Sequence, residues 1–402
     1  MVVSLALLLP TVGLALGAGA GLAPGETGQA GTWSSTVISG AERPVPVLDI
    51  DLDLSARSAV LMDTESGRLL FGRSAHEPLP PASTTKVMTA LIALEQGNLN
   101  DRVTVSERAA ATGEASIWLA PGEQLTLEEL LIGMLVGSGN DAAMAVAEHV
   151  GGTVESFITL MNRRARELGA ADTHFSNPHG LHADDHVTSA YDLALITRQA
   201  MQIPLFREIV AARQAVIPWP DEPWDRRIRA HNRLLTGYEG ADGVKTGFTR
   251  PAGRCLVGHA TRDRLQLTAV VLNAPDTYGD VAQLLDLGFE RFRRLPIIQP
   301  GQAVIELPVS EGTAATVRAG AAESRHAALL NGEADRIELQ VKLSEPLAAP
   351  VARGQRVGEI RIMLAGQELG HANLVSLTAV DVPLLQQFWR NFRNMLRRAI
   401  PG

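Results

Sequence analysis

The spacing of apolar residues changes along this chain, and that change limits the folds available to it. Short apolar runs at residues 59–62 and 69–71 lie on either side of Glu65-Ser66-Gly67, a pattern typical of a β-hairpin. Helical spacing follows at residues 83–94, 126–136, 141–150, 154–168 and 189–201. After Pro204 strand patterns return, at residues 215–217, 243–248, 255–260 and 265–272, before a last helix at about 278–293. Strands on both sides of a helical middle predict an α+β domain, in which helices pack on an antiparallel sheet.

From about Pro300 the pattern becomes a series of short alternations of apolar and polar residues, separated by glycine and proline. The alternations lie at residues 304–307, 337–343 and 360–362. We therefore expect the α+β domain to cover residues 47–296 and a small all-β module to cover residues 297–380. No catalytic constellation is visible in the module, which is interpreted as a spacer or a scaffold for partners.

The N-terminus has the composition of an export signal. Residues 2–20 carry no charge and end in the small residues Ala18-Gly19-Ala20, so residues 1–20 are predicted to be a signal peptide. No lysine or arginine precedes the apolar run and Pro10 interrupts it, which leaves a buried N-terminal helix as the alternative. Residues 21–46 are rich in Gly, Ser, Thr, Ala and Pro and are interpreted as a linker.

The C-terminal segment, residues 381–402, predicts an amphipathic helix. Its apolar residues fall within an arc of about 140° at helical spacing, and its four arginines lie on the opposite side. The apolar residues are Leu384, Leu385, Phe388, Trp389, Phe392, Met395, Leu396 and Ala399. Such a helix suits an anionic membrane surface, and at about 18 residues with interrupting arginines it should not span the bilayer. The alternative is a helix docked on the β-module.

Composition excludes several classes of protein. The chain of 402 residues carries a net charge of −8, which argues against a nucleic-acid-binding protein. Its single cysteine, Cys255, rules out an internal disulfide and makes a zinc–thiolate site improbable. The pairs His182/His186, Glu323/His326 and Glu368/His371 have spacings found in metal sites, but they lie in loop-like or strand-like sequence. We expect no metal and no cofactor.

Three short motifs carry the chemistry: Ser83-Thr84-Thr85-Lys86, Ser138-Gly139-Asn140 and Lys245-Thr246-Gly247. A serine hydroxyl needs an adjacent base, and residues three apart share a helical face, so Lys86 can activate Ser83. Lys86 must be neutral to act as a base, which requires burial or a nearby cation. The alternative is a helix-capping serine followed by a solvated lysine.

The other two motifs suit substrate binding and proton transfer. Ser138 can relay a proton to a leaving amine and Asn140 can hold a substrate amide, although both also suit a capped helix–helix turn. Lys245 and Thr246 offer a cation and a hydroxyl to a terminal carboxylate, although an edge-strand lysine would look the same.

Gly247 lets a peptide substrate approach the strand backbone closely. The backbone N–H groups of Ser83 and Phe248 can then form an oxyanion hole.

These motifs, with further runs at residues 81–89, 138–143, 175–181, 242–249 and 270–275, resemble the low-molecular-mass penicillin-binding proteins over roughly residues 57–293. The resemblance is to the D-alanyl-D-alanine carboxypeptidases of the peptidase S11 family. It implies a β-lactamase/transpeptidase-like catalytic domain, a small C-terminal β-domain and a terminal membrane helix. Ser83 would be the acylated nucleophile, Lys86 its base and Ser138 the proton relay, and Asn140, Lys245, Thr246 and Gly247 would bind substrate.

The resemblance also implies that the enzyme removes the terminal D-alanine from peptidoglycan stem peptides and is acylated by β-lactams. The exported protein would then be peripheral on the outer face of the cytoplasmic membrane. The alternative hypotheses are a β-lactamase, a D,D-endopeptidase, or a catalytically silent cell-wall-binding module. Some members carry an arginine near the helix after the last catalytic strand, where this chain has Tyr278-Gly279-Asp280. His179, His182 and His186 are interpreted as loop-stabilising residues, and Cys255 as a core residue.

Overall fold

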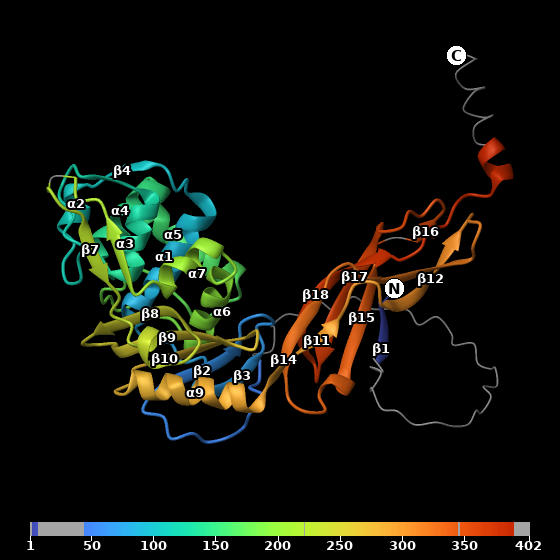
Figure 1. Cartoon of the computed structure of the whole chain (residues 1–402), viewed down its shortest axis with the longest axis horizontal. Coiled ribbons are helices and arrows are strands. Elements are labelled where there is room, and N and C mark those ends of the chain that lie inside the picture. Colours follow the sequence, from blue (N-terminus) through green and yellow to red (C-terminus); the bar gives the residue numbers. More distant parts are fainter. Residues whose placement is uncertain (1, 7–43, 221, 345, 390–402) are drawn as a thin grey trace, which may run out of the picture.

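A computed structural model describes residues 2–6, 44–220, 222–344 and 346–389 of the chain. A domain of helices and sheet is followed by an elongated β-module (Figure 1). The described part of the C-terminal segment lies at the far end of that module (Figure 1). This arrangement confirms the predicted α+β domain and the β-rich module after it.

The first domain is built on an antiparallel five-stranded sheet in the order β3-β2-β10-β9-β8. Its strands are β2 (Ser58–Asp63), β3 (Leu69–Arg73), β8 (Ala241–Thr249), β9 (Gly253–Arg262) and β10 (Leu265–Leu272). Successive side chains alternate between the two faces, so Leu61 and Leu267 pack beneath α9 (Thr277–Arg291). Val60 and Val270 face the helical side, where α6 (Ala190–Ala200) covers the sheet. Both faces of this sheet are therefore buried.

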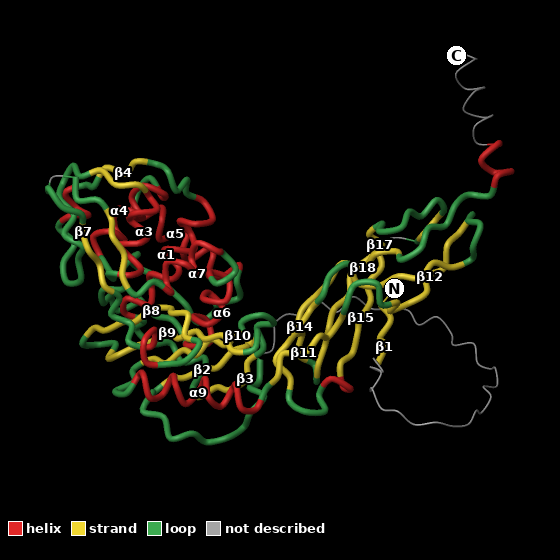
Figure 2. Tube along the Cα trace, viewed as in Figure 1, coloured by secondary structure: helices red, strands yellow, loops and turns green. Residues whose placement is uncertain are grey.

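The predicted helices of the middle segment are present (Figure 2). They are α1 (Lys86–Gln96), α3 (Leu127–Val136), α4 (Asn140–Gly151), α5 (Val154–Glu167) and α6. The short turn η1 (Ala82–Thr85) leads into α1. The Thr126 hydroxyl accepts from the N–H of Glu129, whose carboxylate accepts from the N–H of Thr126, a complete capping box.

The strands expected after Pro204 are preceded by a helix that was not predicted, α7 (Pro204–Ala211), which begins at that proline. Proline is well suited to the first helical position, where its missing N–H costs no hydrogen bond. Several short elements without a clear periodicity were also not predicted from the sequence. They are α2 (Glu107–Ala110), α8 (Leu234–Gly237) and the hairpins of β4 (Arg102–Thr104) with β5 (Gln124–Thr126) and of β6 (Gln214–Ile217) with β7 (Arg226–Arg229).

The β-module contains a seven-stranded sheet in the order β1-β15-β17-β18-β13-β12-β16 and a ribbon of β11 with β14. The strands are β1 (Val2–Ala6), β11 (Arg293–Ile298), β12 (Ala303–Ser310), β13 (Thr316–Ala321), β14 (Arg325–Leu329), β15 (Ile337–Leu343), β16 (Leu347–Ala348), β17 (Arg356–Leu364) and β18 (Gln367–Ser376). A short turn, η2 (Ala334–Arg336), precedes β15. The expected domain boundary at residues 296/297 falls inside β11.

The described part of the predicted signal peptide is β1, which pairs antiparallel with β15. The rest of that segment and nearly all of the predicted linker lie outside the described residues. The signal peptide therefore stays a prediction.

Polar contacts join the β-module to the turn between β2 and β3. The Arg68 guanidinium donates to both carboxylate oxygens of Glu333, at 2.7 and 2.8 Å, and to the Ala328 carbonyl at 2.8 Å. Asp63 accepts from the Ala328 N–H at 2.9 Å, and burial raises the pKa of its carboxyl. The side chains of Arg68 and Glu333 are only 4% and 11% exposed, so their attraction is weakly screened by water.

We predict that Arg68→Met lowers the free energy of unfolding by about 3 kcal/mol, because it leaves the Glu333 carboxylate buried without its cation. The double variant Arg68→Met/Glu333→Met should be less destabilised than the single one. The matched control is Arg294→Met, whose partner Glu65 is 34% exposed and whose loss should cost below about 1 kcal/mol. Urea denaturation measures all three. Equal losses for Arg68→Met and Arg294→Met would contradict the prediction.

Candidate active site

The first and second motifs meet at a buried lysine amine. Ser83 lies in η1, and Lys86 is the first residue of α1. The Lys86 Nζ is 3.0 Å from the Ser83 Oγ, 2.6 Å from the Asn140 Oδ1 and 2.7 Å from the His179 carbonyl oxygen. The whole Lys86 side chain is buried.

The partners of Lys86 suit a neutral amine. A neutral amine has two N–H donors and one lone pair. The Asn140 Oδ1 and the His179 carbonyl can only accept, whereas the Ser83 hydroxyl can also donate. Burial, and then the positive charge of Lys245, hold the pKa of Lys86 well below its usual range. The lone pair of Lys86 is thus available to the Ser83 proton, as nucleophile activation requires.

The two polar residues of the second motif, Ser138 and Asn140, have different surroundings. Ser138 joins α3 to α4 at a φ of 62° and lines the same cavity as Ser83. Asn140, the first residue of α4, uses its Oδ1 on Lys86 and donates its Nδ2 to the Gly113 carbonyl at 2.8 Å. In this structure the Asn140 amide therefore positions Lys86, and its predicted contact with a substrate amide stays a prediction.

The third motif lies on β8, the edge strand of the five-stranded sheet. A Cβ at Gly247 would come within 3.0 Å of the Ser83 backbone nitrogen, so glycine lets the strand approach the nucleophile. The Lys245 ammonium is buried and donates to the Thr246 carbonyl at 3.0 Å. Burial lowers the pKa of Lys245 to about 7.

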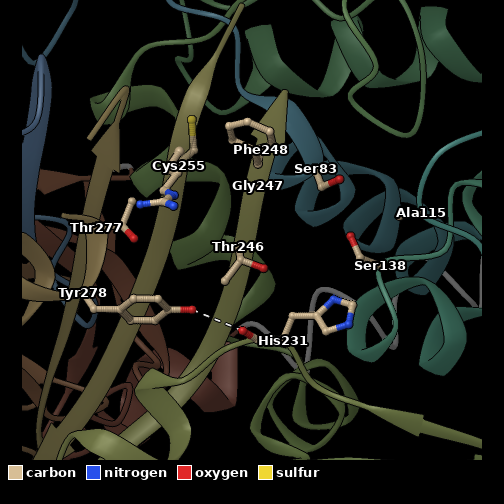
Figure 3. Close-up of a pocket in the computed structure, with 11 residues that line it drawn as sticks. Ser83, Ala115, Ser138, His231, Thr246, Gly247, Phe248, Cys255, Thr277 and Tyr278 are labelled. Carbon is tan, nitrogen blue, oxygen red and sulfur yellow. Dashed lines mark hydrogen bonds between the residues drawn. The ribbon is translucent and has the colours of Figure 1, made fainter. Parts of the chain in front are cut away.

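A cavity of about 320 Å³ opens over these residues (Figure 3). Ser83 and Ser138 project into it from one side, and Thr246, Gly247 and Phe248 form the β8 wall (Figure 3). Lys86, Asn140 and Lys245 are buried and are not among the residues that line the cavity. The lining also includes residues that the motifs did not indicate: Ala115, His231, Arg254, Cys255, Thr277 and Tyr278.

The loop at residues 171–189 supports the nucleophile. His186 Nδ1 accepts from the Ser176 N–H at 2.9 Å, so its Nε2 carries the proton that is donated to the Thr85 hydroxyl at 2.8 Å. This neutral ring agrees with burial, which lowers the pKa of His186 to about 4. Gly180 has a φ of 91°, and a Cβ there would lie 1.9 Å from the Ala82 carbonyl oxygen. His186 thus stabilises this loop, and the same interpretation of the His179 and His182 rings stays a prediction. The His179 carbonyl, which sequence reasoning missed, holds Lys86.

Other reactive groups take no part in this chemistry. Cys255 is 2% exposed, and burial raises the pKa of its thiol to about 11, so it is inert by comparison with an exposed thiol. Among the described residues, His76, Asp172 and Asp192 bring possible metal ligands within 4.8 Å of one another. The Asp192 Oδ2 already accepts from the Asp172 N–H and the Thr173 hydroxyl, at 2.7 Å each. None of these three residues lines the cavity beside Ser83.

Comparison with known proteins gives consistent matches. Residues 44–276 match the family described as D-alanyl-D-alanine carboxypeptidase, and residues 292–382 match the C-terminal domain of penicillin-binding protein 5. The carboxypeptidase DacF of Bacillus subtilis is 32% identical, over 80% of this chain and 85% of its own length. DacC of Escherichia coli is 33% identical, over 85% and 87% respectively. The structure of penicillin-binding protein 5 from Haemophilus influenzae aligns with a TM-score of 0.68 at 30% identity, covering 83% of this chain and 99% of that one.

We predict that the buried Lys245 makes stability depend on pH. With a pKa of about 7 when folded and about 10.5 when unfolded, the unfolded state binds more protons between these values, so stability rises with pH across that window. Between pH 7 and pH 9 the free energy of unfolding should rise by about 2 kcal/mol more in the wild type than in Lys245→Met. Urea denaturation at both pH values measures this. The control is Lys342→Met, which removes an exposed lysine and should keep the wild-type rise. A full rise in Lys245→Met would contradict the prediction.

Proposed function

This chain belongs to the D-alanyl-D-alanine carboxypeptidase family of serine peptidases, and we propose that it cleaves the terminal D-alanine from peptidoglycan stem peptides through an acyl-enzyme on Ser83. It is a serine-type hydrolase of the penicillin-binding class. The observation that carries the proposal is the 3.0 Å contact between the Ser83 Oγ and a buried Lys86 amine.

Acylation begins when Lys86 takes the Ser83 proton as the Oγ attacks the carbonyl carbon of the penultimate residue. The resulting oxyanion lies between the N–H groups of Ser83 and Phe248, whose residues both line the cavity. β8 is an edge strand, so alternate N–H groups point away from β9 and towards a substrate.

The tetrahedral intermediate then collapses. The C–N bond breaks, and the proton held on Lys86 passes through the Ser138 hydroxyl to the departing D-alanine amine. Water then attacks the ester, with its proton returning to Ser83 by the same route in reverse. A β-lactam follows the first half of this path, but its cleaved amine stays covalently attached and blocks the cavity.

We predict that the purified protein releases free D-alanine from an N-acetylated pentapeptide, and that Ser83→Ala lowers the rate at least about 1000-fold because the nucleophile is lost. An enzymatic D-alanine assay measures the release. The control is Ser176→Ala, which removes a hydroxyl from the supporting loop and leaves the nucleophile. Cleavage of cross-linked dimers without release from the pentapeptide would show an endopeptidase instead. Absence of both activities, with no labelling by fluorescent penicillin, would show a silent binding module.

The localisation is a further part of the proposal: a mature enzyme held on the outer face of the cytoplasmic membrane by its C-terminal helix. Residues 384–389 are helical, and Leu384 and Leu385 are 83% and 72% exposed. Their exposure favours an apolar surface as partner over docking on the β-module. The remainder of the predicted amphipathic helix lies outside the described residues. Within the described part of the chain, no helix combines the length and the apolar character needed to cross a bilayer.

We predict that truncation after Asp381 abolishes co-sedimentation with vesicles containing anionic lipid and keeps the release of D-alanine from small peptides. Phe392→Asp with Leu396→Asp should have the same effect, because two carboxylates would enter the apolar face. The matched control, Gln386→Asp with Gln387→Asp, changes the polar face and should weaken binding less than about tenfold. Vesicle binding by the truncated enzyme would refute the anchor.

A further inference from the structure

Among the described residues, no lysine lines the cavity beside Ser83. Lys245 is 3% exposed, its Nζ donates to the Thr246 carbonyl, and it does not line the cavity. An anionic ligand in the cavity therefore needs a cation from another element.

Arg254 is the one arginine among the described residues that line the cavity. It lies on β9 directly opposite Phe248 of β8. Side chains opposite one another, and side chains two apart on a strand, share a face of the sheet, so Arg254 and Thr246 lie on the same face. Thr277, at the start of α9, lines the cavity with them.

The Arg254 side chain is held in place and still has donors for a ligand. Its Nη1 donates to the Pro275 carbonyl at 3.0 Å, which ties the guanidinium to the turn before α9. A guanidinium has five N–H donors arranged in a fork that matches a carboxylate, and arginine carries its charge throughout the physiological pH range. Arg254 is an exposed residue, so a ligand entering the cavity can reach it.

We propose that Arg254 is the cation that binds the terminal carboxylate of the substrate, together with the hydroxyls of Thr246 and Thr277. The proposal rests on the proposed function and assigns the recognition of a free carboxyl terminus to β9. Lys245 then acts mainly on Lys86, whose pKa its charge lowers.

The position where some relatives carry an arginine does not supply a cation here. The Tyr278 hydroxyl donates to the His231 carbonyl and accepts from the Arg233 N–H, both at 3.2 Å. The Arg233 guanidinium stacks 4.6 Å from the centroid of the Tyr278 ring and does not line the cavity. Tyr278 therefore positions the segment at residues 231–233.

The nearby carboxylates are occupied by other partners. Asp276 accepts from the Gly279 N–H at the start of α9, and Asp280 accepts from the backbone and hydroxyl of Ser55 at 2.9 and 2.8 Å. They are engaged in capping α9 and anchoring residue 55, and neither lines the cavity.

The test compares acyl-D-Ala-D-Ala peptides that end in a free carboxylate with the same peptides ending in an amide. Arg254→Ala should raise the KM for the carboxylate peptide about 10- to 100-fold, the usual effect of losing a hydrogen bond to a charged group, and change the KM for the amide less than about threefold. Arg254→Lys should recover part of the affinity, because lysine keeps the charge without the fork. The matched control is Arg250→Ala, an exposed arginine on the same β-hairpin that does not line the cavity.

A second arm separates this proposal from the proposed function. Acylation by benzylpenicillin and by its methyl ester is followed by intact-protein mass spectrometry, which needs no peptidase activity. Arg254→Ala should slow acylation by the acid about 10- to 100-fold and leave the rate with the ester nearly unchanged. Failure of the wild type to release D-alanine would refute the peptidase function but not the role of Arg254. Equal losses on acid and ester, or a carboxylate-selective loss in Lys245→Gln but not in Arg254→Ala, would overturn the proposal.

Discussion

The buried amine of Lys86 is the constraint around which the catalytic domain is organised. Three separate segments bring an oxygen to it: Ser83 from η1, Asn140 from the start of α4, and the His179 carbonyl from the loop at residues 171–189. A charged lysine enclosed by protein would be costly, whereas a neutral one satisfies two acceptors and offers its lone pair to a hydroxyl. Burial in the core and activation of a hydroxyl therefore both favour a neutral Lys86. The elements must close around Lys86 for the core to form, and closing around it favours the neutral amine that the proposed base requires.

Backbone approaches that only glycine permits complete this arrangement. Gly247 brings β8 against η1, and Gly180 brings the supporting loop against the Ala82 carbonyl. Together they place η1, which carries Ser83, between a sheet edge and a loop at close backbone distance. The strand edge stays open to a peptide, and the loop seals the rear of the site. The cavity is thus a by-product of how closely these two backbones approach η1.

Periodicity and motif order could predict most of the fold and the core of the site. The helix that begins after Thr126 could be predicted, because its apolar stripe and its capping box depend only on residues close together in the sequence. The helix that begins at Pro204 could not be predicted, because a proline is as typical of a break between elements as of a first helical residue. The role of the His179 carbonyl has no sequence signature, since every residue carries that group. Arg254 was also missed, because only strand pairing shows that it shares a face with Thr246.

The junction between the two bodies has a mechanical consequence. The β-module contacts the catalytic domain through the turn between β2 and β3, where Arg68 binds Glu333. β3 and β8 are the opposite edges of the five-stranded sheet, four interstrand spacings of about 4.8 Å apart, or roughly 19 Å. The chain also passes directly from α9 into β11, so a load on the module enters the catalytic domain through this turn and through α9, while Ser83 lies beside the β8 edge. The hydrogen-bonded ladders of β2, β10 and β9 lie between the turn and β8 as a stiff plate, so strain at the junction is spread over three strands before it reaches the reacting groups.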